Sequence, residues 1–316
     1  MKTTSLLQGR LLLFCMLFSC VMAACSKDDA TESAAGIGKS ASAKKAAAAA
    51  KSGPVNVCYV EVNNYDIGNV GKYTLDGSGA NVFDIGIIFA ANINYDTNAQ
   101  KAVLFFNPQV TSTLQNIGSI RTLQNKGIKV LLSILGNHQG AGVSNFPNQA
   151  AANDFAAQCA DAVNTYGLDG IDIDDEYANY GANGTGQPNE SSFVYFITEL
   201  RRLLPDKIIS FYYIGPAISR QSYAGVTVGS KVDYAWNPYY STYSAPNVPG
   251  LGNDRLGPAA VDITATSSAT ANSFASRTVS DGYGVYLCYN LTNNNTQSYL
   301  NGITQALYGE NTVYTP

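Results

Sequence analysis

The sequence predicts an α/β fold of the (β/α)8 TIM-barrel class in which one or more outer helices are replaced by loops. The first observation is a series of eight apolar, β-branched runs at intervals of roughly 30–40 residues. Most of these runs are almost continuously apolar, which is typical of parallel strands covered by helices. The eight runs are residues 55–62, 82–90, 128–135, 168–173, 207–213, 232–236, 259–263 and 285–291.

Helical patterns of suitable length lie between several of these runs, and they are the second observation. The expected helices are residues 114–126, 149–166, 191–204, 269–281 and 296–308. Residues 63–81 and 214–257 are instead rich in Gly, Asn, Pro, Ser and Tyr, so we expect long loops or short strands there in place of one to three outer helices. An open doubly wound sheet is the alternative fold, but no Gly-x-Gly-x-x-Gly follows the first strand to support nucleotide binding.

The composition describes a neutral, polar surface. Of the 316 residues, 46% are hydrophobic and only 13% are charged, and the formal net charge is −4. No Lys/Arg-rich run is large enough to indicate a nucleic-acid partner. The 21 Tyr residues can both stack on a ligand and form hydrogen bonds, or simply cover the surface.

The N-terminus resembles a targeting segment. Lys2 and Arg10 precede an apolar run over residues 11–24 that is too short for a comfortable membrane span. Small residues stand directly before Cys25, as in a bacterial lipobox, where the Cys is acylated and becomes the mature N-terminus. We therefore expect residues 1–24 to be a lipoprotein-type signal peptide and Cys25 to be lipidated. A secretory signal cleaved near Ala24 is the alternative.

The rest of the chain divides into two parts. Residues 25–53 are rich in Ala, Ser, Lys and Gly and are interpreted as a flexible tether. Residues 54–316 are expected to form a single barrel domain, monomeric and in contact with a membrane only through the lipid anchor. The expected location is the bacterial cell envelope, either lipid-anchored at the outer-membrane surface or secreted.

The cysteines and the single histidine exclude some chemistry. Cys58, Cys159 and Cys288 remain outside the signal, an odd number without metal-ligand spacing. We interpret them as buried small hydrophobic residues, and one disulfide with a spare thiol is the alternative. Because His138 is the only histidine, a Ser-His-Asp triad or a multi-histidine zinc site is not expected.

The most informative stretch is residues 168–176, in which Asp172, Asp174 and Glu176 alternate with other residues. Side chains two apart on a strand share a face, so these three carboxyls would stand in one row. Like charges in a buried place repel, so a fold has little reason to build such a row unless chemistry or a cation uses it. Ca²⁺ or Mg²⁺ is disfavoured, because a straight row does not form a cage and Ile stands between the acids. No metal and no cofactor are expected.

The row suits acid catalysis at a glycosidic bond. Catalytic groups of a barrel lie at the C-terminal ends of its strands, where Glu176 would be the last inward residue, with Asp174 and Asp172 progressively deeper. Neighbouring carboxylates raise the pKa of the rim acid and keep it protonated near neutral pH. Asp172 and Asp174 could share one proton.

Several segments resemble a known family. Asp169-x-x-Asp172-x-Asp174-x-Glu176 is similar to the Asp-x-x-Asp-x-Asp-x-Glu signature of glycoside hydrolase family 18. The strand at 129–136 resembles the Ser-x-Gly-Gly strand of that family, with Leu135 in place of the first Gly. Other segments are similar to the Endo H-type endo-β-N-acetylglucosaminidases within that family, and the resemblance covers nearly the whole globular part. They are residues 166–177, 206–210, 233–240 and 282–291.

The resemblance implies a substrate-assisted retaining mechanism. Glu176 would protonate the leaving oxygen and later act as base on water. Asp174 would hold the acetamido N–H of the substrate, whose carbonyl attacks the anomeric carbon, and Asp172 would support Asp174 from below. Asp169 and Asp175 have the opposite parity and are left outside the catalytic set.

Strand parity and the resemblance suggest further pocket residues. On the strand near 232–239, Asn237 and Tyr239 would face inward and Trp236 outward. Family members commonly use a Tyr from this strand to steady the acetamido carbonyl, which makes Tyr239 the candidate, with Asn237 beside it. Tyr212 and Tyr289 are candidate substrate-binding residues from the fifth and eighth strands.

The resemblance implies hydrolysis of the GlcNAc-β-1,4-GlcNAc bond in the core of N-linked glycans, with high-mannose or hybrid glycans as substrates. The loops at 63–81, 92–99, 137–148 and 241–257 are expected to set the glycan preference. A chitinase of the same family is one alternative, although the single Trp argues against an aromatic chitin cleft. A non-catalytic carbohydrate-binding lipoprotein is another, although such relatives typically lose the acid at the position of Glu176.

Overall fold

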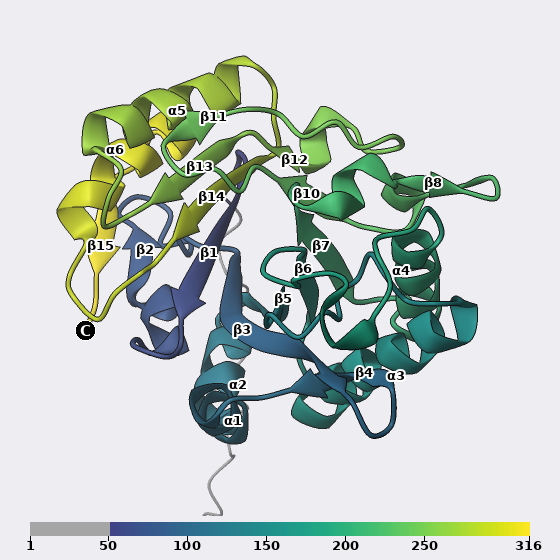
Figure 1. The fold of residues 1–316 in the computed structure, drawn as a ribbon. Coiled ribbons are helices and arrows are strands. Elements are labelled where there is room, and N and C mark those ends of the chain that lie inside the picture. Colours follow the sequence, from purple (N-terminus) through teal and green to yellow (C-terminus); the bar gives the residue numbers. More distant parts are fainter. Residues whose placement is uncertain (1–50) are drawn as a thin grey trace, which may run out of the picture. The chain divides into compact units, whose positions relative to one another are not determined.

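The computed structural model describes residues 51–316, which form a closed barrel of parallel strands with helices on its outside (Figure 1). All eight apolar runs contribute a strand, so the TIM-barrel prediction is confirmed. The barrel strands in spatial order are β1 (Val55–Glu61), β3 (Ile85–Asp96), β5 (Lys129–Gly136), β6 (Gly170–Asp174), β7 (Ile208–Tyr212), β10 (Tyr234–Trp236), β12 (Leu256–Gly257) with β13 (Ala259–Asp262), and β14 (Val285–Tyr289).

The seventh barrel position is divided by a proline. Pro258 stands between β12 and β13 and has no N–H to donate to a neighbouring strand. β12 pairs with β10 through Trp236 and Gly257, whereas β13 pairs with β14. The two half-strands together join β10 to β14, and β14 pairs in turn with β1, which closes the barrel.

Helices cover five of the eight barrel strands. The two-helix segment α1–α2 follows β3 and its hairpin, and α3, α4, α5 and α6 follow β5, β6, β13 and β14. Asn148 caps the start of α3 by accepting a hydrogen bond from the N–H of Ala151, and Gly167 ends it with a left-handed φ of 59°. The helices are α1 (Pro108–Gln115), α2 (Ile117–Asn125), α3 (Gln149–Tyr166), α4 (Ser192–Leu203), α5 (Ser268–Ser280) and α6 (Gln297–Tyr308).

The three remaining strands are followed by short elements, as the composition of residues 63–81 and 214–257 predicts. The segment after β1 holds η1 (Ile67–Lys72) and β2 (Tyr73–Leu75), which pairs with β15 (Thr312–Tyr314). The segments after β7 and β10 contain no α-helix. They hold η3 (Pro216–Ser219), β8 (Ser222–Tyr223), β9 (Val226–Thr227), η4 (Val228–Ser230), β11 (Thr242–Tyr243) and η5 (Asn253–Arg255).

One region differs from the sequence prediction. Residues 92–99 were expected as a loop, but β3 continues to Asp96 and forms an antiparallel hairpin with β4 (Lys101–Phe105). The Asp96 carboxylate accepts hydrogen bonds from the N–H groups of Asn98 and Ala99, which makes the reversal local. The hairpin projects from the C-terminal end of β3 and lies against α3 (Figure 1), where the N–H of Leu104 donates to the side chain of Gln158.

Two apolar clusters make up the core. The larger lies between the strands and the outer elements and includes Cys58, Cys159 and Cys288, which are buried and free, so the expectation of three buried small hydrophobic residues is confirmed. The smaller cluster fills the barrel and includes Tyr59 and Trp236. Burying a large apolar side chain contributes about 1.5–3 kcal/mol each.

The expected signal peptide, Cys25 and nearly all of the tether lie outside the described residues. Lys51, the first described residue, already packs on the barrel: its ammonium group lies 3.0 Å from the Asp84 carboxylate and donates to the carbonyl of Asn81. Residues 51–53 therefore adjoin the folded part. Within residues 51–316, no helix is long and apolar enough to cross a membrane.

Candidate active site

Asp172 lies at the centre of the barrel and is completely buried. Ser133 and Ser210 are its register partners on β5 and β7, and each hydroxyl donates a 2.8 Å hydrogen bond to the carboxylate. Tyr59 on β1 donates a third hydrogen bond of 2.8 Å. Burial raises the pKa of Asp172 to about 6, although these three donors oppose the rise.

Asp174 is the next residue on the same face and is 4% exposed. Its Oδ1 atom is buried and has no hydrogen-bond partner in the described part of the chain. Burial raises the pKa of Asp174 well above its ordinary value, and the charges of Glu176 and Asp172 raise it further. Asp174 therefore offers an unpaired oxygen, and it binds a proton far more readily than an ordinary aspartate.

Glu176 is half-buried at the rim. The sequence placed it as the last inward residue of the strand, but β6 ends at Asp174 and Glu176 lies in the segment that follows. Burial raises the pKa of Glu176, the hydrogen bond with Asp174 lowers it, and the charge of Asp175 raises it. Glu176 is thus biased toward the protonated form that a general acid needs.

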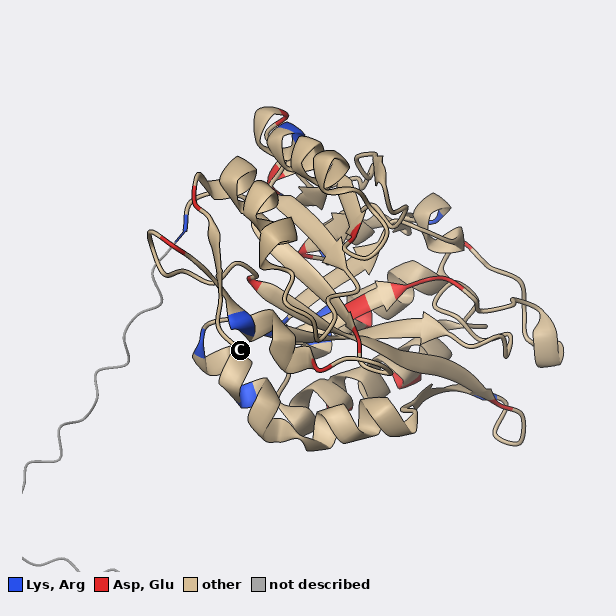
Figure 2. Ribbon diagram, turned by 90° about the vertical axis from the view of Figure 1, so that its left-hand side faces the viewer, with Lys and Arg blue, Asp and Glu red and all other residues tan. Residues whose placement is uncertain are grey.

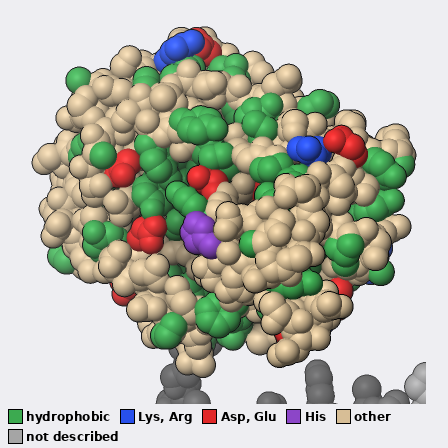
Figure 3. Space-filling model, in the orientation of Figure 1, with side chains coloured by type: hydrophobic (Ala, Val, Ile, Leu, Met, Phe, Trp, Pro, Cys, Tyr) green, Lys and Arg blue, Asp and Glu red, His purple; other side chains and the backbone are tan. Residues whose placement is uncertain are grey.

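The acidic groups stand out on a molecule of few charges. Figure 2 shows a red run within the sheet. Figure 3 shows acidic and apolar side chains lining a hollow beside the single histidine. That residue, His138, contacts Tyr177 through its ring and donates a 2.6 Å backbone hydrogen bond to it.

A group of four tyrosines forms one wall of the site. The rings of Tyr59 and Tyr212 are stacked with their centres 4.7 Å apart. The rings of Tyr240 and Tyr289 are stacked at the same separation. The hydroxyls of Tyr212 and Tyr240 lie 3.0 Å apart and join the two pairs. Tyr289 also donates a hydrogen bond to Glu61 at the end of β1. The structure thus brings the two candidate residues Tyr212 and Tyr289 into one group, although Tyr212 is only 2% exposed.

The predicted faces of β10 are reversed. Tyr234 and Trp236 are paired in register with Ser210 and Tyr212, whose side chains point into the barrel, so they point inward as well. Trp236 is fully buried there and donates a 2.7 Å hydrogen bond from Nε1 to the hydroxyl of Tyr59. The expectation that Trp236 faces outward was therefore wrong.

The reversal also moves the residues at the end of β10. Asn237 is buried, but its amide donates to Thr242 and to the carbonyl of Pro258, so it holds the turn and not a ligand. Tyr239, the expected catalytic tyrosine, is 54% exposed, whereas Tyr240 lies in the tyrosine group. The tyrosine next to the acids is therefore Tyr240, and the assignment of Tyr239 from the sequence was off by one residue.

The two acids outside the catalytic set have separate surroundings. Asp169 accepts hydrogen bonds from the Gln124 amide and the Val130 N–H at the N-terminal end of β6, so its structural role is confirmed. Asp175 was expected to point away from the other acids, and it does so. It is 5% exposed and accepts hydrogen bonds from Ser144 and from other groups described below.

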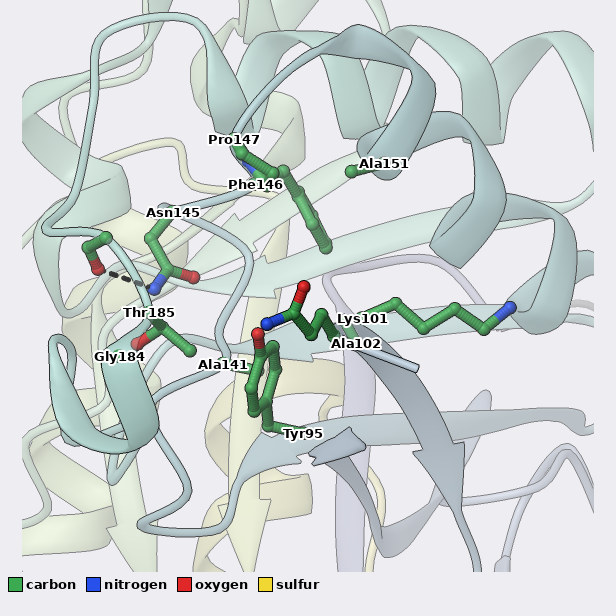
Figure 4. Close-up of a pocket in the computed structure, with 12 residues that line it drawn as sticks. Tyr95, Lys101, Ala102, Ala141, Asn145, Phe146, Pro147, Ala151, Gly184 and Thr185 are labelled. Atoms are coloured by element: carbon green, nitrogen blue, oxygen red, sulfur yellow. Dashed lines mark hydrogen bonds between the residues drawn. The ribbon is translucent and has the colours of Figure 1, made fainter. Parts of the chain in front are cut away.

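A cavity of about 150 Å³ lies among loops that follow the barrel strands, and none of the three acids lines it (Figure 4). The β3–β4 hairpin, the loop after β5 and the loop after β6 surround it. Its lining residues are Tyr95, Gln100, Lys101, Ala102, Ala141, Asn145, Phe146, Pro147, Ala151, Gly184, Thr185 and Gly186. Within residues 51–316, no group of three or more His, Cys, Asp or Glu side chains is arranged to hold a metal ion.

Some site residues could not be identified from the sequence. Tyr59 was missed because it stands in an apolar strand that matches none of the motifs quoted above. Tyr240 was missed because it lies beyond β10, whose faces were predicted the wrong way round. Ser133 lies in the segment resembling the family's Ser-x-Gly-Gly strand, which was the one signal that could have identified it.

An eight-stranded barrel with a row of acids at the end of its fourth strand defines a class of glycosidases. The glycosyl hydrolases family 18 model matches residues 55–292, and the chain belongs to this family. It is 57% identical over 265 residues to an endo-β-N-acetylglucosaminidase of Flavobacterium sp. (strain SK1022), covering 84% of this chain and 83% of that protein.

The chain is also similar to two further proteins. The chain is 31% identical over 323 residues to endo-β-N-acetylglucosaminidase F1 of Elizabethkingia meningoseptica, covering 98% of this chain and 94% of that protein. Its fold matches EndoBT-3987 of Bacteroides thetaiotamicron in complex with a Man5GlcNAc product, with a TM-score of 0.74 and 26% identity. That match covers 84% of this chain and 63% of the longer solved chain.

Proposed function

We propose that the protein is an endoglycosidase that hydrolyses the β-1,4 bond between the two GlcNAc residues in the core of N-linked glycans. The products are a free glycan and a protein that retains one GlcNAc. The observation that carries this proposal is the half-buried Glu176 beside the unpaired Oδ1 of Asp174, in a chain of this family. High-mannose or hybrid glycans are the expected substrates.

The first step is cleavage with help from the substrate. Glu176 donates its proton to the glycosidic oxygen as the bond to the anomeric carbon breaks. The carbonyl oxygen of the sugar's own acetamido group attacks that carbon and forms an oxazolinium-like intermediate. Asp174 accepts a hydrogen bond from the acetamido N–H through its free oxygen and stabilises the developing positive charge.

The second step restores the acid. The Glu176 carboxylate takes a proton from water, which attacks the anomeric carbon and opens the oxazolinium ring. Two displacements retain the configuration at that carbon. Asp172 sits below Asp174 in a set of three hydrogen bonds, which keeps it in place while protons redistribute between the two carboxyls.

The tyrosine group is suited to orient the acetamido group. The Tyr240 hydroxyl, bound to that of Tyr212, can donate to the acetamido carbonyl and direct it toward the anomeric carbon. Tyr289 stacks on the Tyr240 ring, and the buried Tyr212 holds Tyr240 through its hydroxyl. Asn237 supports the turn that carries Tyr240.

Chitin is the alternative substrate. The only Trp lies inside the barrel, completely buried, so it does not line an exposed cleft for a long polymer. A purely carbohydrate-binding role does not explain why Glu176 is kept with a raised pKa next to Asp174. The N-glycan core is therefore the preferred substrate.

The cavity beside the β3–β4 hairpin is a candidate binding place for the outer sugars of the glycan. Its walls come from residues 137–148, where the sequence predicted a contribution to glycan preference, and from the β3–β4 hairpin.

We also propose that the protein is a monomer attached to the cell envelope through a lipid on Cys25. Labelled palmitate should enter the wild type and not Cys25→Ala if that attachment exists.

The test of the function uses a high-mannose glycoprotein with the wild type and with Glu176→Gln, and it follows the released glycan by mass spectrometry. The wild type should release a glycan ending in one GlcNAc, and the variant should be slower by about 10²–10⁴-fold. Absence of release by the wild type, or equal release by both proteins, would contradict the proposal. Soluble chitin oligosaccharides in parallel reactions distinguish the chitinase alternative.

A further inference from the structure

Asp175 is a buried carboxylate that the mechanism above does not use. It follows Asp174 in the chain and points to the opposite side of the segment, where it is 5% exposed. Its carboxylate accepts a 2.7 Å hydrogen bond from the Ser144 hydroxyl and a 2.9 Å hydrogen bond from the N–H of Ala217. The Tyr180 hydroxyl donates a third hydrogen bond, so every group on this carboxylate is a donor.

These donors come from three different segments. Ser144 belongs to the loop after β5, Tyr180 to the loop after β6, and Ala217 to η3 after β7. The Tyr180 hydroxyl also accepts a 3.2 Å hydrogen bond from the N–H of Ser144. Asp175 thus connects the ends of three adjacent barrel strands directly behind Glu176.

Two glycines bring the neighbouring segments close to this point. A Cβ atom on Gly136, at the end of β5, would lie 2.2 Å from the carbonyl oxygen of Glu176. A Cβ atom on Gly215, after β7, would lie 2.0 Å from the carbonyl oxygen of Asp175. The backbone of residues 175–176 is therefore enclosed between the ends of β5 and β7.

The side chain of Glu176 has little support of its own. In the described part of the chain, its carboxyl interacts with Asp174 on the same segment, and no hydrogen bond from another segment reaches it. Its position therefore depends on the backbone that carries it. That backbone is held by the carboxylate of the preceding residue.

We propose that Asp175 is a positioning residue, which fixes the backbone of Glu176 by binding Ser144, Tyr180 and Ala217 and thereby sets the position of the acid. The expected changes in kcat and KM rest on the proposed function, because they are measured as glycan release. It deepens that function by assigning a role to the fourth carboxyl of the stretch, which points away from the substrate.

The charge of Asp175 adds a second effect on Glu176. The groups that face Asp175 are Tyr180 and Ser144, the N–H of Ala217, and Arg220, which also lies 3.5 Å from the Glu190 carboxylate. The charge of Asp175 raises the pKa of Glu176. Removing it should lower that pKa, so Glu176 loses its proton at lower pH and the alkaline limb of the activity profile shifts downward.

The test compares Asp175→Asn with Asp169→Asn on the full chain. Both substitutions neutralise a hydrogen-bonded carboxylate on the same stretch, but Asp169 lies at the opposite end of β6. Asp175→Asn should lower kcat by about a hundredfold, the effect of a displacement of about 1 Å, with KM nearly unchanged and the alkaline limb shifted downward. Asp169→Asn should keep kcat and the pH profile even where it lowers Tm.

Ser144→Ala and Tyr180→Phe each remove one donor and should lower kcat in the same direction by smaller factors. These variants keep the proposal testable if Asp175→Asn does not fold. The proposal would be overturned if Asp175→Asn kept both the kcat and the alkaline limb of the wild type. It would also be overturned if Ser144→Ala and Tyr180→Phe both kept the kcat of the wild type.

A measurement without substrate separates this proposal from the function itself. The pKa of Glu176 can be followed by NMR titration of its 13C-labelled side-chain carboxyl, with Glu176→Gln to assign the signal. Asp175→Asn should lower this pKa and Asp169→Asn should not. An unchanged pKa in Asp175→Asn would contradict the proposal, whether or not the wild type releases glycans.

Discussion

The hydroxyl of Tyr59 on β1 donates a 2.8 Å hydrogen bond to Asp172 on β6, across the interior of the barrel. The same hydroxyl accepts a 2.7 Å hydrogen bond from Nε1 of Trp236 on β10. The carboxyl below Asp174 is therefore held through a tyrosine and a tryptophan from strands that are distant in sequence. The barrel interior thus serves as a polar support for the catalytic row as well as an apolar core.

Tyr59→Phe should impair both stability and activity. It leaves Nε1 of Trp236 without its acceptor in a buried place, which costs roughly 1–3 kcal/mol. It also removes a donor that lowers the pKa of Asp172, so this pKa should rise and kcat should fall. Thermal unfolding and glycan release at several pH values measure the two effects.

Tyr286→Phe is the matched control. Tyr286 is also fully buried, and its hydroxyl donates a 2.8 Å hydrogen bond to the carbonyl of Ala271, away from the acids. Its loss should lower Tm without changing kcat. An equal loss of kcat in both variants would show that Tyr59 acts only through stability.

Tyr240→Phe and Tyr239→Phe distinguish two adjacent tyrosines. Tyr240 stacks on Tyr289 and binds the Tyr212 hydroxyl, whereas Tyr239 is 54% exposed. Loss of the Tyr240 hydroxyl should reduce kcat by about a hundredfold, because it removes a donor to the acetamido carbonyl. Tyr239→Phe should stay within about twofold of the wild type, a difference of under 1 kcal/mol. The opposite ranking would restore the assignment made from the sequence.

Gly136→Ala tests the close approach of β5 to residues 176–178, the segment that carries Glu176. The added Cβ would lie 2.2 Å from the carbonyl oxygen of Glu176 and 2.5 Å from the backbone nitrogen of Ala178, so residues 176–178 must move. A displacement of about 1 Å should reduce kcat by about a hundredfold. Gly118→Ala, in α2, meets nothing closer than 3.8 Å and should keep full activity. Full activity in Gly136→Ala would contradict this account.

Asp172 should make the wild type less stable as the pH rises. Its pKa is about 6 in the folded protein against an ordinary 3.8, so its contribution to stability is present below about pH 4 and is lost as the pH rises through 6. The cost is on the order of 3 kcal/mol. Asp172→Asn cannot ionise, so its Tm should fall less than that of the wild type between pH 4 and pH 7. Parallel Tm curves would contradict the raised pKa.

The fold and the catalytic row could be predicted from the sequence because both depend on local patterns. Eight apolar runs mark the barrel strands, and the alternation at 172–176 places Asp172 and Asp174 on one face. The row survives the early end of β6, because Glu176 still reaches the rim from the following segment. The confirmed role of Asp169 rests on the same alternation.

The rest of the site depends on partners that local sequence does not specify. The faces of β10 follow from its register with Ser210 and Tyr212 on β7, and three residues of strand carry too little alternation to show this. The β3–β4 hairpin was missed because β4 is short and pairs only with the end of β3, residues 92–96, which were expected as a loop. Tyr59 meets Asp172 only when the barrel closes.

The central claim is that Asp174 acts in forming the oxazoline intermediate and that Glu176 handles protons. The most direct measurement compares wild type, Asp174→Asn and Glu176→Gln on two substrates, a high-mannose glycoprotein and the preformed sugar oxazoline of the same glycan. Asp174→Asn should consume the oxazoline readily, whereas its release of glycan from the glycoprotein should fall by about 10²–10³-fold. Loss of both reactions in Asp174→Asn, or wild-type glycan release, would contradict the claim.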